Sequence, residues 1–193
     1  MAQTVRQAWV ALRVLLVMTV LVGIVYPLAV FLVGRVVPST ADGSFVTDAS
    51  GTVVGSALIG QSFDGSEWFW PRPSAAGDGY DGLASGGSNL AADNPDLVSA
   101  VAERQSAAAA ADGVAPAEVP ADAVTASGSG LDPDISPEYA QQQVTRVAAA
   151  RGLDVATVES LVADHTQGRA LGFVGEPRVN VLELNLALSQ LTP

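Results

Sequence analysis

A run of 20 residues without a charge, from Val14 to Val33, constrains this chain more than any other part of its sequence. As a helix with a rise of about 1.5 Å per residue, the run would span about 30 Å, the thickness of the hydrocarbon core of a bilayer. Gly23 and Pro27 inside it are tolerated in a membrane helix, because neighbouring helices can satisfy backbone groups that a kink sets free. The sequence therefore predicts a transmembrane helix over residues 14–34.

The alternative for this segment is a cleaved secretory signal. Arg6 and Arg13 precede the run, and Ser-Thr-Ala at 39–41 has the small-x-small pattern of a cleavage site. The apolar core of a signal is usually only about 7–15 residues long. The length of the run favours an uncleaved anchor.

The arginines indicate which way the anchor lies. Arg6 and Arg13 precede it, whereas Arg35 alone lies close behind it, and the cytoplasmic flank of a membrane helix usually carries the excess of basic residues. We therefore expect a single-pass protein of the cell membrane. Its N-terminus, residues 1–13, would be cytoplasmic, and its soluble domain, residues 35–193, would lie outside.

The composition excludes several classes of function. The chain has 20 Asp and Glu against 9 basic residues, and its net charge of -11 makes nucleic acid an unfavourable partner. It contains no cysteine, which excludes disulfides and thiolate metal sites. Every basic residue is an arginine, so a lysine-dependent phosphate-binding loop or Schiff base is excluded as well. We expect no catalytic residues and no metal site.

The outer part of the chain is predicted to form one helix-rich α+β domain with a few short strands. Apolar and aromatic stretches at 52–63 and 67–71 predict strands. The glycine-rich and serine-rich stretch 74–94 predicts a long loop, of a length that is usually functional or disordered. The stretch 109–124 is rich in Ala and Pro, and its middle is predicted to be a surface linker between two halves of the domain.

Capping residues and glycines predict the helices of this domain. Three are expected, each with a capping residue at its start and a glycine at its end: 94–113, 136–152 and 154–168. The last element, 179–191, is ambiguous, because its leucines alternate as in a strand while Asn180 could cap a helix. Helix is favoured. The aromatic residues 68–70 are predicted to be buried, with an exposed contact as the alternative.

Two glycine-rich loops raise the question of phosphate binding. GDGYDG at 77–82 fits G-x-G-x-x-G, but no helix is expected to open there, as a dinucleotide site requires. ASGGSNL at 84–90 resembles the signature loop of ABC transporter ATPases, whose amides contact a nucleotide phosphate. Such an ATPase also needs a phosphate-binding lysine, which this chain lacks. The favoured interpretation is that Gly86 and Gly87 provide turns.

Two further motifs are weak as sites. His165, the single histidine, is predicted to pack on the apolar face of a helix. LDPDISP at 131–137 begins like a calcium loop, but position six is Pro137 and position twelve is Gln143. Asp134 and Ser136 are instead expected to order the loop and to cap the following helix.

Taken in order, several blocks of sequence resemble the C subunit of the Kdp potassium-transporting ATPase over nearly the whole chain. After the membrane helix these blocks are GSALIGQSF (55–63), WFWPRPSA (68–75), SGGSNL (85–90), DAVTASGSGLDPDISP (122–137), RVAAARG (146–152), HTQGR (165–169) and GEPRVNVLELNLAL (175–188). The Ala-rich segment 102–120 and AADNP after the serine-glycine loop depart from the pattern.

The resemblance implies an accessory, non-catalytic subunit of a high-affinity, ATP-driven potassium uptake complex, needed for its assembly and tuning. The implied partners are a channel-like A subunit, a P-type ATPase B subunit and a small F subunit. The family is described as a catalytic chaperone that raises the ATP affinity of the B subunit, and the chain would have no cofactor of its own. The resemblance also implies a nucleotide-contacting loop formed by Ser85, Gly86, Gly87, Ser88 and Asn89.

The implied nucleotide contact conflicts with the orientation indicated by the arginines, because ATP is hydrolysed in the cytoplasm. The leading hypothesis places the domain outside, docked on the channel-like subunit. The alternative is a nucleotide-responsive regulator with loop 85–89 on the cytoplasmic side. The stretch between Arg72 and Arg104 contains no basic residue to pair with a triphosphate.

Overall fold

The computed structural model describes residues 2–191, so residue 1 of the predicted N-terminal segment and residues 192–193 of the predicted domain lie outside the described range. The chain divides into two compact units between Ser44 and Phe45, and each unit is described by itself.

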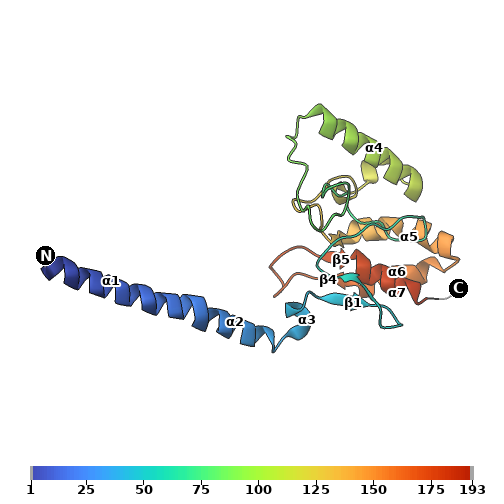
Figure 1. Ribbon diagram of the computed structural model, residues 1–193. Coiled ribbons are helices and arrows are strands. Elements are labelled where there is room, and N and C mark those ends of the chain that lie inside the picture. The colour runs from blue at the N-terminus through green and yellow to red at the C-terminus, as the bar shows by residue number, and fades with distance from the viewer. Residues whose placement is uncertain (1, 192–193) are drawn as a thin grey trace. The chain divides into compact units, whose positions relative to one another are not determined.

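The first unit is a long helical segment. It consists of α1 (Ala2–Val20), η1 (Leu21–Val25) and α2 (Tyr26–Gly34), followed by the short α3 (Pro38–Ala41). Residues 2–34 form the one described helix that is long and apolar enough to cross a membrane (Figure 1). It ends where the prediction over 14–34 ends, and it begins earlier, because residues 2–13 are helical as well.

A π-helical turn interrupts this helix just before Pro27. The prolyl ring has no N–H and would clash with the carbonyl of Gly23, four residues earlier. Leu21–Val25 adopts the wider π form, and the Tyr26 N–H donates to the carbonyl oxygen of Leu21, five residues back. Such a local widening accommodates a proline within a helix that continues on both sides.

The second unit begins with a β-hairpin. β1 (Phe45–Thr47) pairs antiparallel with β2 (Val53–Ser56). The Asp48 carboxylate holds the turn, accepting hydrogen bonds from the Ser50 and Thr52 backbone N–H groups at 2.8 and 2.9 Å. A hydrogen bond from the Ser50 hydroxyl and these amides lower the pKa of Asp48. Of the predicted strand 52–63, only residues 53–56 form a strand.

Three very short strands form the other sheet, in the order β3-β5-β4: β3 (Asp134–Ile135), β5 (Arg178–Asn180) and β4 (Thr166–Gln167). Both pairings are antiparallel, and Val179 in the central strand lies opposite Ile135 and Thr166. Val179 is fully buried and Ile135 nearly so. The sheet therefore joins β3 to the hairpin formed by β4 and β5, which lies further along the chain.

Four helices build most of the second unit: α4 (Pro95–Asp112), α5 (Pro137–Arg151), α6 (Val155–Asp164) and α7 (Val181–Ser189). The Asn94 and Ser136 side chains accept from the Asp96 and Tyr139 N–H groups, as predicted for N-caps. Left-handed glycines, Gly113 and Gly152, end α4 and α5, also as predicted. Figure 1 shows α5 between α4 on one side and the pair α6 and α7 on the other.

The core lies between α5, α6, α7 and the three-stranded sheet. Its largest fully buried apolar side chains are Phe69, Tyr139, Leu184 and Leu188. Burial of an aliphatic or aromatic side chain of this size contributes about 1.5–3 kcal/mol. The predicted α+β class, with one N-terminal apolar helix, further helices and a few short strands, is confirmed.

One predicted helix boundary is wrong. α6 ends at Asp164 rather than at Gly168, because Thr166 and Gln167 pair with β5. The middle of the stretch 109–124 lies at the surface, as predicted, and contains a 3-10 turn, η2 (Pro116–Glu118); a second, η3 (Ala121–Ala123), follows it. Ala123 and Val124 are buried in the core. The helix favoured for the ambiguous segment 179–191 is confirmed by α7, and the first two residues of the segment belong to β5.

The predicted strand at 67–71 is also wrong, although the segment is extended and Phe69 is fully buried. Side chains take the place of a neighbouring strand. The Phe69 N–H donates to Oδ1 of Asn185, and Nδ2 of Asn185 donates to the Phe69 carbonyl oxygen, both at 2.9 Å. Gln143 makes the same reciprocal pair with Trp70, at 2.6 and 3.2 Å. The prediction of buried aromatics holds for Phe69, and Trp68 and Trp70 are partly buried.

Candidate functional site

The loop 85–89 packs against a second loop of the same chain, 127–130. The Gly86 N–H donates to the carbonyl oxygen of Ser129 at 2.8 Å, and the Ser85 hydroxyl donates to the same oxygen at 3.0 Å. Gly86 and Gly87 are half-buried, whereas Ser85, Ser88 and Asn89 are exposed. All five predicted residues therefore lie in one loop, and two of its donor groups already form hydrogen bonds within the chain.

Close approach explains two of the glycines in this pair of loops, Gly87 and Gly130. A Cβ at Gly87 would lie 3.2 Å from the carbonyl oxygen of Gly128. At Gly130, where φ is +67°, it would lie 2.6 Å from the Gly86 carbonyl oxygen and 2.7 Å from the Ala76 nitrogen. In the described loop 85–89 the positive φ belongs to Asn89, at 52°, so Gly87 serves close contact rather than a left-handed turn.

Ser74 and Tyr80 brace the preceding loop. The Ser74 hydroxyl donates to the carbonyl oxygen of Gly130 at 2.6 Å and accepts from the Tyr80 N–H at 2.8 Å. The Tyr80 hydroxyl donates to the Arg72 carbonyl oxygen at 2.6 Å, and burial raises the pKa of Tyr80 to about 12. Side chains of the long loop 74–94 therefore order the start of this loop, which follows the aromatic segment, residues 66–71.

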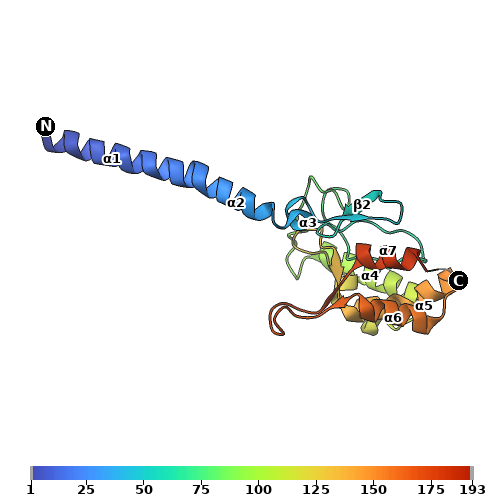
Figure 2. The same ribbon diagram turned by 90° about the horizontal axis from the view of Figure 1, so that it is seen from below.

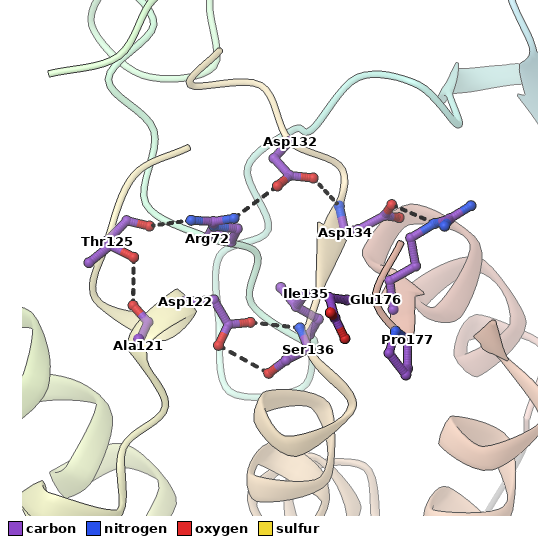
Figure 3. A pocket seen from close by; sticks show the side chains of 11 residues that line it. Arg72, Ala121, Asp122, Thr125, Asp132, Asp134, Ile135, Ser136, Glu176 and Pro177 are labelled. Carbon is purple, nitrogen blue, oxygen red and sulfur yellow. Dashed lines mark hydrogen bonds and ion pairs between the residues drawn. The ribbon is translucent and has the colours of Figure 1, made fainter. Parts of the chain in front are cut away.

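A cleft of about 490 Å³ opens beside this loop (Figure 3). Its lining residues are Arg72, just after the aromatic segment 66–71, and residues within the ranges 121–125, 132–136 and 176–178. The charged ones are Arg72, Asp122, Asp132, Asp134, Glu176 and Arg178. Four carboxylates against two guanidinium groups leave the lining acidic. Residues from four separate segments of the sequence therefore meet here.

Pairing neutralises most of these charges. Nη1 of Arg72 lies 3.0 Å from Oδ2 of Asp132, and Nε of Arg178 lies 3.0 Å from Oδ2 of Asp134. Nε of Arg72 is buried and has no hydrogen-bond partner among the described residues. Burial raises the pKa of Asp134, and the nearby Arg178 opposes this effect.

The floor of the cleft is a helix cap. The Asp122 carboxylate accepts from the Ser136 N–H at 2.6 Å and from the Ser136 hydroxyl at 3.0 Å, as Figure 3 shows. The Ser136 hydroxyl also caps α5, and Asp134 orders its surroundings through Arg178 and Asn180, as predicted for both residues. An oxygen that is engaged in a cap is poorly placed to act as a nucleophile. The cleft can therefore bind groups, but it offers no nucleophile–base pair.

His165 lies at the C-terminal end of α6, where its Nδ1 is 2.9 Å from the carbonyl oxygen of Leu161. It is half-buried, which agrees with the predicted packing role. Across residues 2–191 no cluster of three or more His, Cys, Asp or Glu side chains is arranged to hold a metal ion.

Sequence reasoning missed the residue that fastens the aromatic segment, Arg146 of α5. Its Nε pairs with Oδ1 of Asp112 at 2.8 Å, and its Nη1 donates to the carbonyl oxygens of Ser66 and Trp68 at 2.8 and 2.9 Å. Its guanidinium carbon lies 3.9 Å from the centre of the Trp70 ring. The available signal was a polar residue on an apolar helix face, which Gln143 and Asn185 also provide.

Comparisons with known proteins agree over nearly the whole chain. The family described as KdpC, K⁺-transporting ATPase, c chain, matches residues 8–190. The potassium-transporting ATPase KdpC subunit of Kineococcus radiotolerans is 64% identical over 188 residues, which cover 97% of this chain and 95% of the relative. Subunits of the same description from Beijerinckia indica and Mycobacterium tuberculosis are 52% and 53% identical. The alignments cover 100% and 96% of this chain, and 96% and 99% of the relatives.

Proposed function

The chain belongs to the KdpC family of K⁺-transporting ATPase subunits, and from this membership we propose that it is an accessory, non-catalytic subunit of an ATP-driven potassium uptake pump. Its role is the assembly and tuning of the complex. Its partners are a channel-like A subunit, a P-type ATPase B subunit and a small F subunit. The observation that carries the proposal is the match of family and relatives over almost the full length.

The long helix supports the proposed membrane anchoring. Residues 2–34 form one apolar helix, and the two arginines Arg6 and Arg13 lie in its N-terminal part, whereas Arg35 follows its end. Since basic residues mark the cytoplasmic flank, this placement favours a cytoplasmic N-terminus and a second unit outside the cytoplasm.

Two observations support the proposed absence of catalysis: several catalytic residue types are missing, and the candidate side chains have structural roles. The chain has no lysine or cysteine, and its single histidine is engaged with the end of α6. The serine in the cleft caps a helix. ATP would then be handled by the B subunit, and the effect of this chain on ATP affinity would reach that subunit through the assembled complex.

Contact of loop 85–89 with nucleotide is the less favoured alternative. The Gly86 amide, which a phosphate would need, already donates to Ser129. Arg72 is the basic residue nearest before the loop, and it pairs with Asp132. These contacts account for the serine-glycine loop as a packing element of the domain.

The two hypotheses place the second unit on opposite sides of the membrane. Labelling of a cysteine introduced at Ser88 tests which side is right. The chain has no cysteine of its own, and Ser88 is exposed, so an introduced thiol is the single target. We expect a membrane-impermeant maleimide to label Ser88→Cys in intact cells. A matched Gln3→Cys variant should be labelled only after permeabilisation. Protection of Ser88→Cys until the cells are opened would contradict the outside placement and restore the nucleotide reading.

A further inference from the structure

The segment that joins β4 to β5, residues 168–177, presents an apolar tip to solvent. Leu171 is 87% exposed, Phe173 75% and Val174 51%. Figure 2 shows this loop extending beyond α5 and α6 of the second unit. Exposed apolar residues that stand singly on a surface need no explanation, but three within four positions at the tip of a projecting loop indicate an interaction site.

The tip is held in one shape by its own backbone. The N–H groups of Ala170 and Val174 each donate to the carbonyl oxygen of the other, both at 2.9 Å. Leu171 and Gly172 close the turn in the left-handed region, with φ of 53° and 81°. A leucine rarely adopts this conformation, and here it places a large apolar side chain at the apex of the turn. Such order lowers the entropy that a contact at this site would lose.

The charges around the tip fit a protein partner better than a lipid surface. Arg169 pairs with Glu176 beside the tip, and Arg178 pairs with Asp134 at its base. Elements that bind bilayers combine apolar residues with basic residues that can reach lipid phosphates. The second unit also carries 19 of the 20 carboxylates and six of the nine arginines, so an anionic bilayer repels it. An apolar centre with a charge-paired rim is the arrangement found at protein interfaces.

We propose that this hairpin tip, Leu171 with Phe173 and Val174, inserts into an apolar pocket on another subunit of the K⁺-transporting ATPase. The proposal rests on the accessory-subunit function above and deepens it by naming the contacting residues. A single hairpin is small beside the roughly 800 Å² that each partner buries in a typical stable interface. The tip therefore acts as an anchor within a larger contact.

Photocrosslinking in the purified, assembled complex tests the proposal. In the full chain, Leu171→Cys carries a benzophenone maleimide as its single label, because the native chain has no cysteine. We expect one dominant crosslink to another subunit. Val98→Cys on α4, whose native side chain is 56% exposed, is the matched control and should give little or none.

A second pair of variants measures the contribution of the tip. Leu171→Ser combined with Phe173→Ser should lower recovery of the other subunits with this chain about tenfold, as expected when an anchor residue is lost, and Val98→Ser should leave recovery unchanged. Both variants should unfold at the temperature of the unmodified chain, which separates a lost contact from a lost fold.

The outcomes distinguish this inference from the proposed function. If the unmodified chain fails to purify with any other subunit, the accessory-subunit function itself fails. The hairpin proposal alone is wrong if the unmodified chain purifies with other subunits, Leu171→Cys crosslinks only to lipid or to nothing, and the double serine variant assembles normally. Crosslinks to lipid would make the tip a bilayer contact.

Discussion

Two segments of the second unit, 66–71 and 168–177, each lie beside an ion pair, and the two pairs differ in burial. The side chains of Arg146 and Asp112, beside the aromatic segment, are 7% and 0% exposed. Those of Arg178 and Asp134, at the base of the projecting hairpin, are 47% and 24% exposed. A buried pair loses far more when one partner is removed, because the remaining charge is left without water. Stability should therefore concentrate at the aromatic segment, which leaves the hairpin tolerant of change and available for contact.

The largest effect is expected for Arg146→Met, which keeps the length of the side chain and removes its charge. The variant leaves the Asp112 carboxylate buried without its cation, and such a loss lowers the free energy of unfolding by about 3–5 kcal/mol. Chemical denaturation of the full chain in detergent, followed by tryptophan fluorescence, measures it. Adding Asp112→Leu should restore part of the stability, and a double variant as unstable as the single one would contradict the assignment to the buried charge.

A somewhat smaller loss is expected for Asn185→Ala. The N–H and carbonyl groups of Phe69 would both lose their partner in a fully buried position, which lowers the free energy of unfolding by about 2–4 kcal/mol. Ser189→Ala, an exposed position on the same helix, serves as the control and should stay within about 0.5 kcal/mol. Equal effects of the two variants would mean that the side chain of Asn185 does not replace a strand.

Gly130→Ala extends the comparison to the serine-glycine loop. Its Cβ would meet the Gly86 carbonyl oxygen and the Ala76 nitrogen inside contact distance, so a loss of about 1–3 kcal/mol is expected. Gly128→Ala is the matched control two residues away, because its Cβ would meet nothing within 4 Å. If Gly130→Ala left stability unchanged, the packing account of this loop would have to be abandoned.

Local signals in the sequence predicted the helices well and the aromatic segment poorly. Caps such as Asn94 and Ser136, and glycines such as Gly113, act on their own backbone neighbours, so their positions mark helix ends. The extended form of residues 67–71 was also readable from the aromatics. Its partners were not, because Asn185 lies 116 positions further along the chain.

The candidate sites show the same limit. The glycines of loop 85–89 favoured turns, and the resemblance implied a nucleotide contact there, but the close approach of residues 127–130 is a property of the folded chain that no local pattern displays. The hairpin tip, in contrast, was not predicted as a site. HTQGR and GEPRVNV flank it in the sequence, but the five residues between them, 170–174, carried no prediction of structure or contact. Their exposure, which indicates an interaction site, depends on where β4 and β5 end.

The smallest effect is expected at the base of the hairpin and concerns pH. Burial raises the pKa of Asp134 above its ordinary value of 3.8, so the folded chain holds this proton more tightly than the unfolded chain does. Protonation of Asp134 therefore adds stability as the pH falls through the raised pKa, and the gain is complete below 3.8. The advantage of the native chain over Asp134→Asn in unfolding free energy should accordingly grow on acidification. Because the pair is partly exposed, solvent screening keeps this change small.

Asp48 provides a control of opposite sign. Hydrogen bonds lower its pKa, so its contribution is present above the ordinary value and is lost as the pH falls through the lowered one. Denaturation of the three chains across the acidic range measures both slopes. The advantage of the native chain over Asp48→Asn should shrink on acidification, while its advantage over Asp134→Asn grows. Two slopes of the same sign would show that the ion pair with Arg178 outweighs burial at Asp134, and the assignment of its raised pKa to burial would be wrong.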